Sequence, residues 1–149
     1  MGVTLAQLLD AVADQLRSVF EDTTDVQVHV VSGLFRSAEM PAVNVYPAAR
    51  AVTQEFAAFG ELYGGWPMNI RVAVSPADID AGEALLWAFM DDDTDPLSII
   101  SALDEDHQLG GIADDLAWGE WAGYQEFADA DGGRIVGSTL PIIVAKAHS

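Results

Sequence analysis

Apolar side chains recur at steps of three and four near the start of the chain, at Leu5, Leu8, Leu9, Val12, Leu16, Val19 and Phe20. This spacing puts them on one side of an α-helix, so the pattern predicts an amphipathic helix over residues 4–20. Thr4 and Gln7 have the spacing of a capping box, in which two side chains at a helix start bond each other's backbone. We expect the apolar side of this helix to pack on the domain's own sheet.

Three strands are predicted after this helix. Apolar and polar residues alternate over residues 26–30, which is typical of a half-buried strand. A second strand is expected around Val43 and Val45, ending at Pro47, and a third at residues 70–74. The glycine-rich stretch at residues 52–67 has a weak apolar pattern, which favours the limbs and tip of a long hairpin.

That hairpin carries apolar bulk that is hard to bury at a loop tip, at Phe56, Phe59, Leu62, Tyr63 and Trp66. Exposed aromatic side chains are typical anchors of protein interfaces. We therefore predict that these residues, together with Trp118 and Trp121, contact other subunits. Trp87 has apolar neighbours within a predicted helix and is expected in the core.

Two helices are predicted in the second half. Ser75 and Pro76 suit the start of the first helix, which ends at the acidic run of residues 91–93. Its apolar face consists of Ile79, Leu85, Leu86, Phe89 and Met90. Asp95 and Pro96 then begin a short helix, whose apolar residues are Leu97, Ile100 and Leu103. Two glycines at residues 110–111 break the chain again.

A β-hairpin is predicted at the end of the chain. Leu116, Trp118 and Tyr124 lead to a turn at residues 129–133, and the last strand covers residues 135–144. Pro141 has no N–H group, so this strand is expected at a sheet edge or with a bulge. The resulting order is an α+β fold with a mostly antiparallel sheet, a long hairpin and helices packed on one face. The length fits a single domain over residues 1–149.

Charge limits the partners of the chain. There are 24 acidic residues and six basic ones, which gives a formal net charge of −18. Phosphate backbones and anionic lipids are bound by Lys and Arg, so binding to nucleic acid or membranes through charge is not expected. No apolar run is long enough to span a bilayer, and no secretory signal is recognised. The absence of cysteine excludes disulfides, thiolate nucleophiles and Cys-based zinc sites.

Candidate chemistry is sparse. Asp91, Asp93 and Asp95 imitate the start of an EF-hand loop, but Pro96 and Ala102 stand where that loop needs Gly and Glu. Either a solvated acidic loop or a weak Ca²⁺ or Mg²⁺ site fits this segment. The polar residues 104–107 are expected to face water, where carboxylates lack the contrasting environments that acid–base catalysis needs. Without a nucleotide-binding or nucleophile motif, we expect no catalytic residue, no dedicated metal site, no cofactor and no enzymatic activity.

The order and spacing of these elements resemble the tail terminator, or tail completion, proteins in the neck of long-tailed bacteriophages of the siphophage type. The resemblance covers nearly the whole chain and begins with the opening helix. Its most suggestive segments are the strand Pro-Ala-Val-Asn-Val-Tyr-Pro at residues 41–47 and the turn Leu-Gly-Gly-Ile at residues 109–112, after an acidic helix end. The helix at residues 84–90 and the apolar last strand at residues 140–144 also match.

The resemblance implies a structural virion protein that forms a hexameric ring on the last ring of the tail tube. Such a ring ends tube polymerisation and joins the head through its connector or stopper, and DNA passes through its lumen without specific binding. We accordingly expect assembly in the host cytoplasm and a final location in the neck, at the top of the tail. The hairpin at residues 52–67 is expected to reach a neighbouring subunit or the tube ring below.

Two other functions stay open at this point. A head–tail stopper or adaptor would share the small size and the ring formation. An acidic host-directed inhibitor or DNA mimic belongs to another class and needs regularly spaced surface carboxylates, whereas those of this chain are scattered.

Overall fold

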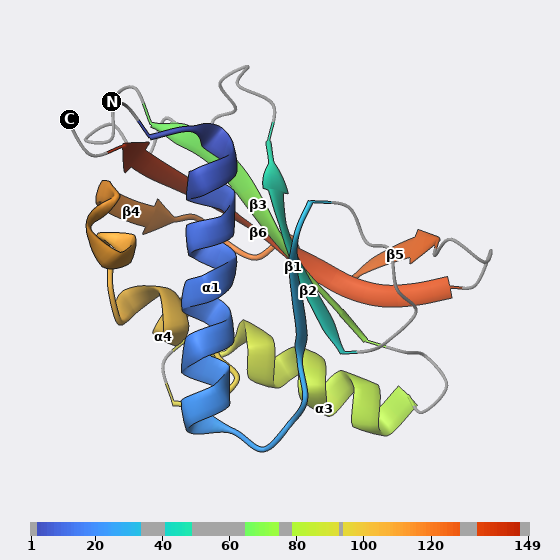
Figure 1. Cartoon of the computed structure of the whole chain (residues 1–149). Coiled ribbons are helices and arrows are strands. Elements are labelled where there is room, and N and C mark those ends of the chain that lie inside the picture. Colours follow the sequence, from blue (N-terminus) through green and yellow to red (C-terminus); the bar gives the residue numbers. More distant parts are fainter. Residues whose placement is uncertain are drawn as a thin grey trace.

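The computed structural model describes residues 3–33, 41–48, 65–74, 79–92, 94–128 and 134–146 (Figure 1). The elements in chain order are α1 (Leu5–Thr23), β1 (His29–Ser32), β2 (Ala42–Pro47), β3 (Trp66–Val74), α3 (Ile79–Met90), α4 (Ile99–Asp104), the 3₁₀ turn η1 (Leu109–Gly111), β4 (Ala113–Trp118), β5 (Gln125–Ala128) and β6 (Arg134–Lys146).

One sheet contains the six described strands. Its order is β1-β2-β3-β6-β4, and β5 pairs with the other end of β6. Strands β1 and β2 run parallel, and the remaining pairs are antiparallel. The prediction of an α+β fold with a mostly antiparallel sheet is therefore confirmed.

The core lies between one face of this sheet and the helices (Figure 1). Leu8 and Leu16 of α1 and Phe89 of α3 are fully buried, as are Ile70 of β3 and Leu140 of β6. All five belong to one apolar cluster, which confirms that the helices pack on a single face. Removing this much apolar surface from water is the main term that stabilises a domain of this size.

The start of α1 is set by its sequence. The Oγ1 atom of Thr4 accepts a hydrogen bond from the Gln7 N–H at 3.1 Å, and the Thr4 N–H donates to Gln7 Oε1 at 2.8 Å. The capping box is thus confirmed, because both residues satisfy an otherwise unpaired backbone donor. The helix continues to Thr23, beyond the predicted end at Phe20.

Strands β2 and β3 form the base of the predicted long hairpin. Their pairing runs from Ala42 opposite Ala73 to Pro47 opposite Met68. The Ala48 N–H adds a bond of 3.0 Å to the Pro67 carbonyl. The predicted tip, from Val52 onward, lies outside the described residues until Gly65.

Strand β1 begins later than the sequence pattern indicates. The prediction placed it at residues 26–30, whereas the strand covers His29–Ser32 and Val26 is exposed. The His29 N–H bonds the Pro41 carbonyl, and the Gly33 N–H bonds the Val45 carbonyl. The alternation of apolar and polar residues indicates which face of the sheet each side chain lies on. The ends of the strand are set by the backbone hydrogen bonds that the neighbouring strand offers.

The short helix α4 also begins later than expected. Asp95 and Pro96 form a turn in which Asp95 Oδ1 accepts from the Leu97 N–H at 2.9 Å. The N-cap is Ser98, whose Oγ accepts from the Ser101 N–H at 3.1 Å. Leu97 is buried although it lies before the helix. Its apolar character therefore indicates that it is buried and does not indicate that it belongs to the helix.

The C-terminal part differs from the predicted simple hairpin. Two short strands, β4 and β5, pair with opposite ends of β6. The prediction of an edge strand is wrong, because β6 lies between β3 and β4. The predicted alternative, a bulge, does not occur at Pro141: the irregularity of this pairing lies between Ala113 and Asp115 of β4. The Pro141 carbonyl accepts from the Gly119 N–H at 2.8 Å. Since the nitrogen and carbonyl of a strand residue face the same neighbour, the missing N–H faces the gap between β4 and β5 and costs no ladder bond.

Candidate interaction surfaces

The predicted interface residues are only partly placed. Phe56, Phe59, Leu62 and Tyr63 lie outside the described residues, so their role stays a prediction. Trp66 begins β3, Trp118 ends β4, and Trp121 lies in the segment that follows β4. These three are partly buried and pack against the core cluster.

Each of these tryptophans has a local role in the domain. Trp66 lies opposite Val144 of β6. Trp118 meets the ring of His107 edge to face, with centroids 5.5 Å apart. In the described part of the chain, the indole N–H of Trp121 is buried without a hydrogen-bond acceptor, which is an unfavourable state for a polar group. Burial therefore makes none of the three a freely exposed anchor.

The most exposed tryptophan is the one that the sequence placed in the core. Trp87 of α3 is 59% exposed, while Leu86 and Phe89 beside it are fully buried. Its indole Nε1 donates to the hydroxyl of Tyr124, which is itself 50% exposed. The Tyr124 hydroxyl donates in turn to Glu83 Oε2 at 3.3 Å. The expectation of a buried Trp87 is wrong because its position on the helix points away from the sheet.

A helical wheel of α3 contains the signal that was missed. Asp80 and Glu83 stand seven and four residues before Trp87, on the same side of the helix. Side chains that share a face with two carboxylates are seldom in a core. Hydrophobic character alone therefore assigned Trp87 to the wrong side.

A groove runs between the second half of α1 and strand β1. Its volume is about 620 Å³, and its apolar lining includes Phe20, Val26, Val28 and Val31. Val26 and Val31 are among the exposed large apolar residues of the described chain, with 38% and 37% of their surface in water. Among the described strands, β1 is the outermost one on this side of the sheet, so the groove lies beside an edge of the described sheet.

One arginine covers that edge. The Nη2 atom of Arg17 donates to the Val30 carbonyl at 2.8 Å, and its Nη1 atom contacts Asp14 at 2.5 Å. The Val30 carbonyl points away from β2, so Arg17 occupies a group that an added strand would use. The side chain of Ser32 also contacts α1, since its hydroxyl donates to Asp10 at 2.7 Å. Such cover protects edge strands from uncontrolled pairing.

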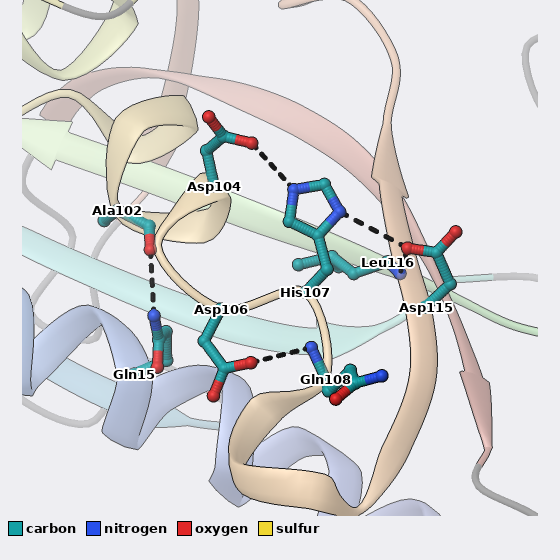
Figure 2. A network of polar contacts seen from close by, with 8 residues as sticks. All are labelled: Gln15, Ala102, Asp104, Asp106, His107, Gln108, Asp115 and Leu116. Carbon is teal, nitrogen blue, oxygen red and sulfur yellow. Dashed lines mark hydrogen bonds and ion pairs between the residues drawn. The ribbon is translucent and has the colours of Figure 1, made fainter.

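The acidic cluster after α4 surrounds a histidine. His107 contacts Asp104 Oδ1 through Nε2 at 2.7 Å and Asp115 Oδ1 through Nδ1 at 3.3 Å (Figure 2). The hydrogen bond to Asp104 is the main cause that raises the pKa of His107, and Asp115 acts in the same direction. The bridge ties the end of α4 to β4 at a largely exposed place. Its geometry serves to hold two elements together.

Two other carboxylates organise turns. Asp106 accepts hydrogen bonds from the backbone N–H groups of Gly110 and Gln108, which lower its pKa (Figure 2 shows the bond to Gln108). Asp91 accepts from the hydroxyl and N–H of Thr94 and from the N–H of Asp95, and these bonds lower its pKa in the same way. Both carboxylates are thus used in loop geometry.

Little in the structure supports an EF-hand-like metal site at residues 91–95. Asp93 lies outside the described residues. Among the residues that the structure describes, no three His, Cys, Asp or Glu side chains gather in a way that could hold a metal ion. Weak cation binding at this loop stays an untested alternative.

Comparisons with known proteins add no family. Neither the protein-family models nor the curated protein sequences give a match to this chain. Within the described residues, none of the helices has the length and apolar character to cross a bilayer.

Proposed function

We propose that this chain is a structural virion protein that forms a ring on the end of a phage tail tube, ends tube growth and provides the joint to the head. The observation that carries the proposal is that β1 forms an edge of the described sheet, with a groove beside it. Ring formation needs one surface on each copy that receives a different surface of the next copy, and an edge strand beside a groove is suited to that role.

The cover of this edge supports assembly on demand. Arg17 and Asp14 form an exposed pair, with 44% and 70% of their side chains in water. Exposed ion pairs contribute only about 0–1 kcal/mol. An incoming segment can therefore break the Arg17–Asp14 pair at small cost, and its own N–H group can replace Arg17 as the donor to the Val30 carbonyl. This fits a protein whose β1 edge exchanges an internal contact for a contact with a neighbouring copy.

Charge supports the same function. With a net charge of −18, the chain repels the DNA that must pass through a neck channel. Among the side chains that the structure describes, the guanidinium groups are those of Arg17 and Arg71, and both have partners inside the molecule. Arg71 donates to the Tyr46 hydroxyl at 3.1 Å and stacks over its ring. DNA would find few cations on these surfaces to hold it.

The test is electron microscopy of the purified protein, alone and with tails that lack it. Rings at one end of each tail are the expected result. Val31→Glu places a charge in the groove and should abolish rings while the monomer stays folded. Ala122→Glu adds the same charge at an exposed position outside the groove and should leave the rings intact. Rings formed equally by both variants would remove the groove from the proposal.

Two further outcomes separate the alternatives. Binding to DNA-filled heads in preference to tails would identify a stopper or adaptor instead. A protein that stays solitary with tails and heads, yet binds a host protein, would favour the inhibitor. Deletion of residues 60–65 tests the hairpin tip independently, because normal tails from that variant would exclude the tip from tube capping.

A further inference from the structure

The outer side of α3 carries an exposed tryptophan within an acidic surround. Trp87 is 59% exposed, although tryptophan is usually among the more buried residues. Tyr124 lies against it, and Glu83 stands one helical turn before it. We call the surface of Trp87, Tyr124 and Glu83 the aromatic–acidic patch.

Hydrogen bonds hold the side chains of this patch in place. The indole N–H donates to the Tyr124 hydroxyl, and this hydroxyl donates to Glu83 at 3.3 Å. The three side chains thus lie together on the surface, where a partner can contact all of them.

Further carboxylates border the patch. Asp80 is exposed on the same helix, two turns before Trp87. Glu126 of β5 is exposed and lies opposite Val136, which packs against the core on the helix side of the sheet. Paired residues share a face, so Glu126 stands on the side where Tyr124 meets α3. Asp80 and Glu83 thus place negative charge beside the aromatic surface.

We propose that the aromatic–acidic patch docks an arginine-bearing segment of another protein. A guanidinium group can stack on an aromatic face while its N–H groups bond carboxylates, and the patch offers both kinds of contact. Lysine matches less well, because its compact ammonium does not stack as a plane.

A second copy of this chain is a poor occupant of the patch. Each copy has a net charge of −18, so two acidic faces repel. The described guanidinium groups, those of Arg17 and Arg71, are bonded within their own molecule. The net charge therefore favours a basic partner over a second copy, and the inference stands whether or not the chain forms rings.

The experiment titrates the full ¹⁵N-labelled chain with a short peptide that contains several arginines and no acidic residue. A peptide with citrulline at the same positions is the neutral control. The readout is the four indole N–H signals, with that of Trp87 assigned through Trp87→Phe. The buffer contains about 0.15 M salt, so that long-range attraction is largely screened.

We expect the Trp87 signal to shift most and the citrulline peptide to bind at least about fivefold more weakly. Trp87→Ala and Glu83→Gln should each weaken the arginine peptide by about threefold or more. Glu105→Gln, which removes an equal charge from an exposed position beyond α4, should change the affinity less than about twofold.

Three results would overturn the inference. Equal weakening by Glu83→Gln and Glu105→Gln would show diffuse attraction to an acidic protein. An unshifted Trp87 signal at saturation would place the peptide elsewhere. Self-association that disappears in Trp87→Ala, seen by sedimentation, would make a second copy the occupant. Since all measurements use the isolated chain, they succeed or fail separately from the tail experiments.

Discussion

Replacing His107 should make the stability of the domain less dependent on pH. This side chain joins Asp104 at the end of α4 to Asp115 on β4, at 2.7 and 3.3 Å. Both carboxylates raise its pKa above the ordinary value of 6.5, and the Asp104 contact contributes most. His107→Gln removes the charge while it keeps a polar side chain of similar reach.

The sign follows from the raised pKa. A histidine that is more basic in the folded protein stabilises it fully below the unfolded pKa, and this contribution is lost as pH rises through the folded pKa. The side chains of His107, Asp104 and Asp115 are 38%, 67% and 56% exposed, so solvent screens both contacts. Two exposed pairs at about 0.2–1 kcal/mol each contribute about 1 kcal/mol to the free energy of unfolding. Loss of this contribution in His107→Gln should lower the melting temperature by about 3 °C.

The assay is urea unfolding of both proteins between about pH 5.5 and about pH 9. The other titratable groups, which both proteins share, contribute the same pH dependence to each. The difference between the two proteins removes that shared term. It should be largest near pH 5.5 and vanish near pH 9. A difference that is constant with pH, or that grows toward alkaline pH, would refute the role of the bridge.

Other substitutions test the packing and the strand pairing. Phe89→Ala should cost about 3–5 kcal/mol, because Phe89 is fully buried and meets Phe20 edge to face. Trp87→Ala should cost less than about 1 kcal/mol in the same denaturant titration, since Trp87 faces water. Thr4→Ala should lower stability by about 0.5–2 kcal/mol through loss of the helix cap, which thermal melting by circular dichroism can follow. Pro141→Ala should change the free energy of unfolding by less than about 1 kcal/mol, whereas Leu140→Ala should lower it by about 2–5 kcal/mol.

Local chemistry explains what the sequence could predict. The capping box of Thr4 and Gln7 needs only two residues at a fixed spacing, so the start of α1 follows from the sequence. The alternation of residues 70–74 likewise identifies part of β3, which is longer in the structure. These features depend on neighbours along the chain. They do not depend on which elements meet in space.

The errors arise where distant elements decide. The start of β1 depends on hydrogen bonds offered by β2, and Pro41 and Val45 supply them only from His29 onward. The place of β6 inside the sheet is compatible with Pro141 because two separate strands share its other side. The pairing of two separate strands with β6 cannot be inferred from the residues around Pro141. The orientation of Trp87 was accessible from the sequence, but only through the angular positions of Asp80 and Glu83 beside it.

Salt should separate the two proposed interactions of this chain. Ring contacts at the β1 edge join copies of equal negative charge through backbone and apolar groups, so screening of their repulsion should favour rings. Docking of an arginine segment on the aromatic–acidic patch joins opposite charges, and the same screening should weaken it. Electron microscopy and the peptide titration over one salt series would measure both. If the two responses had the same sign, one of the two surfaces would be assigned to the wrong kind of partner.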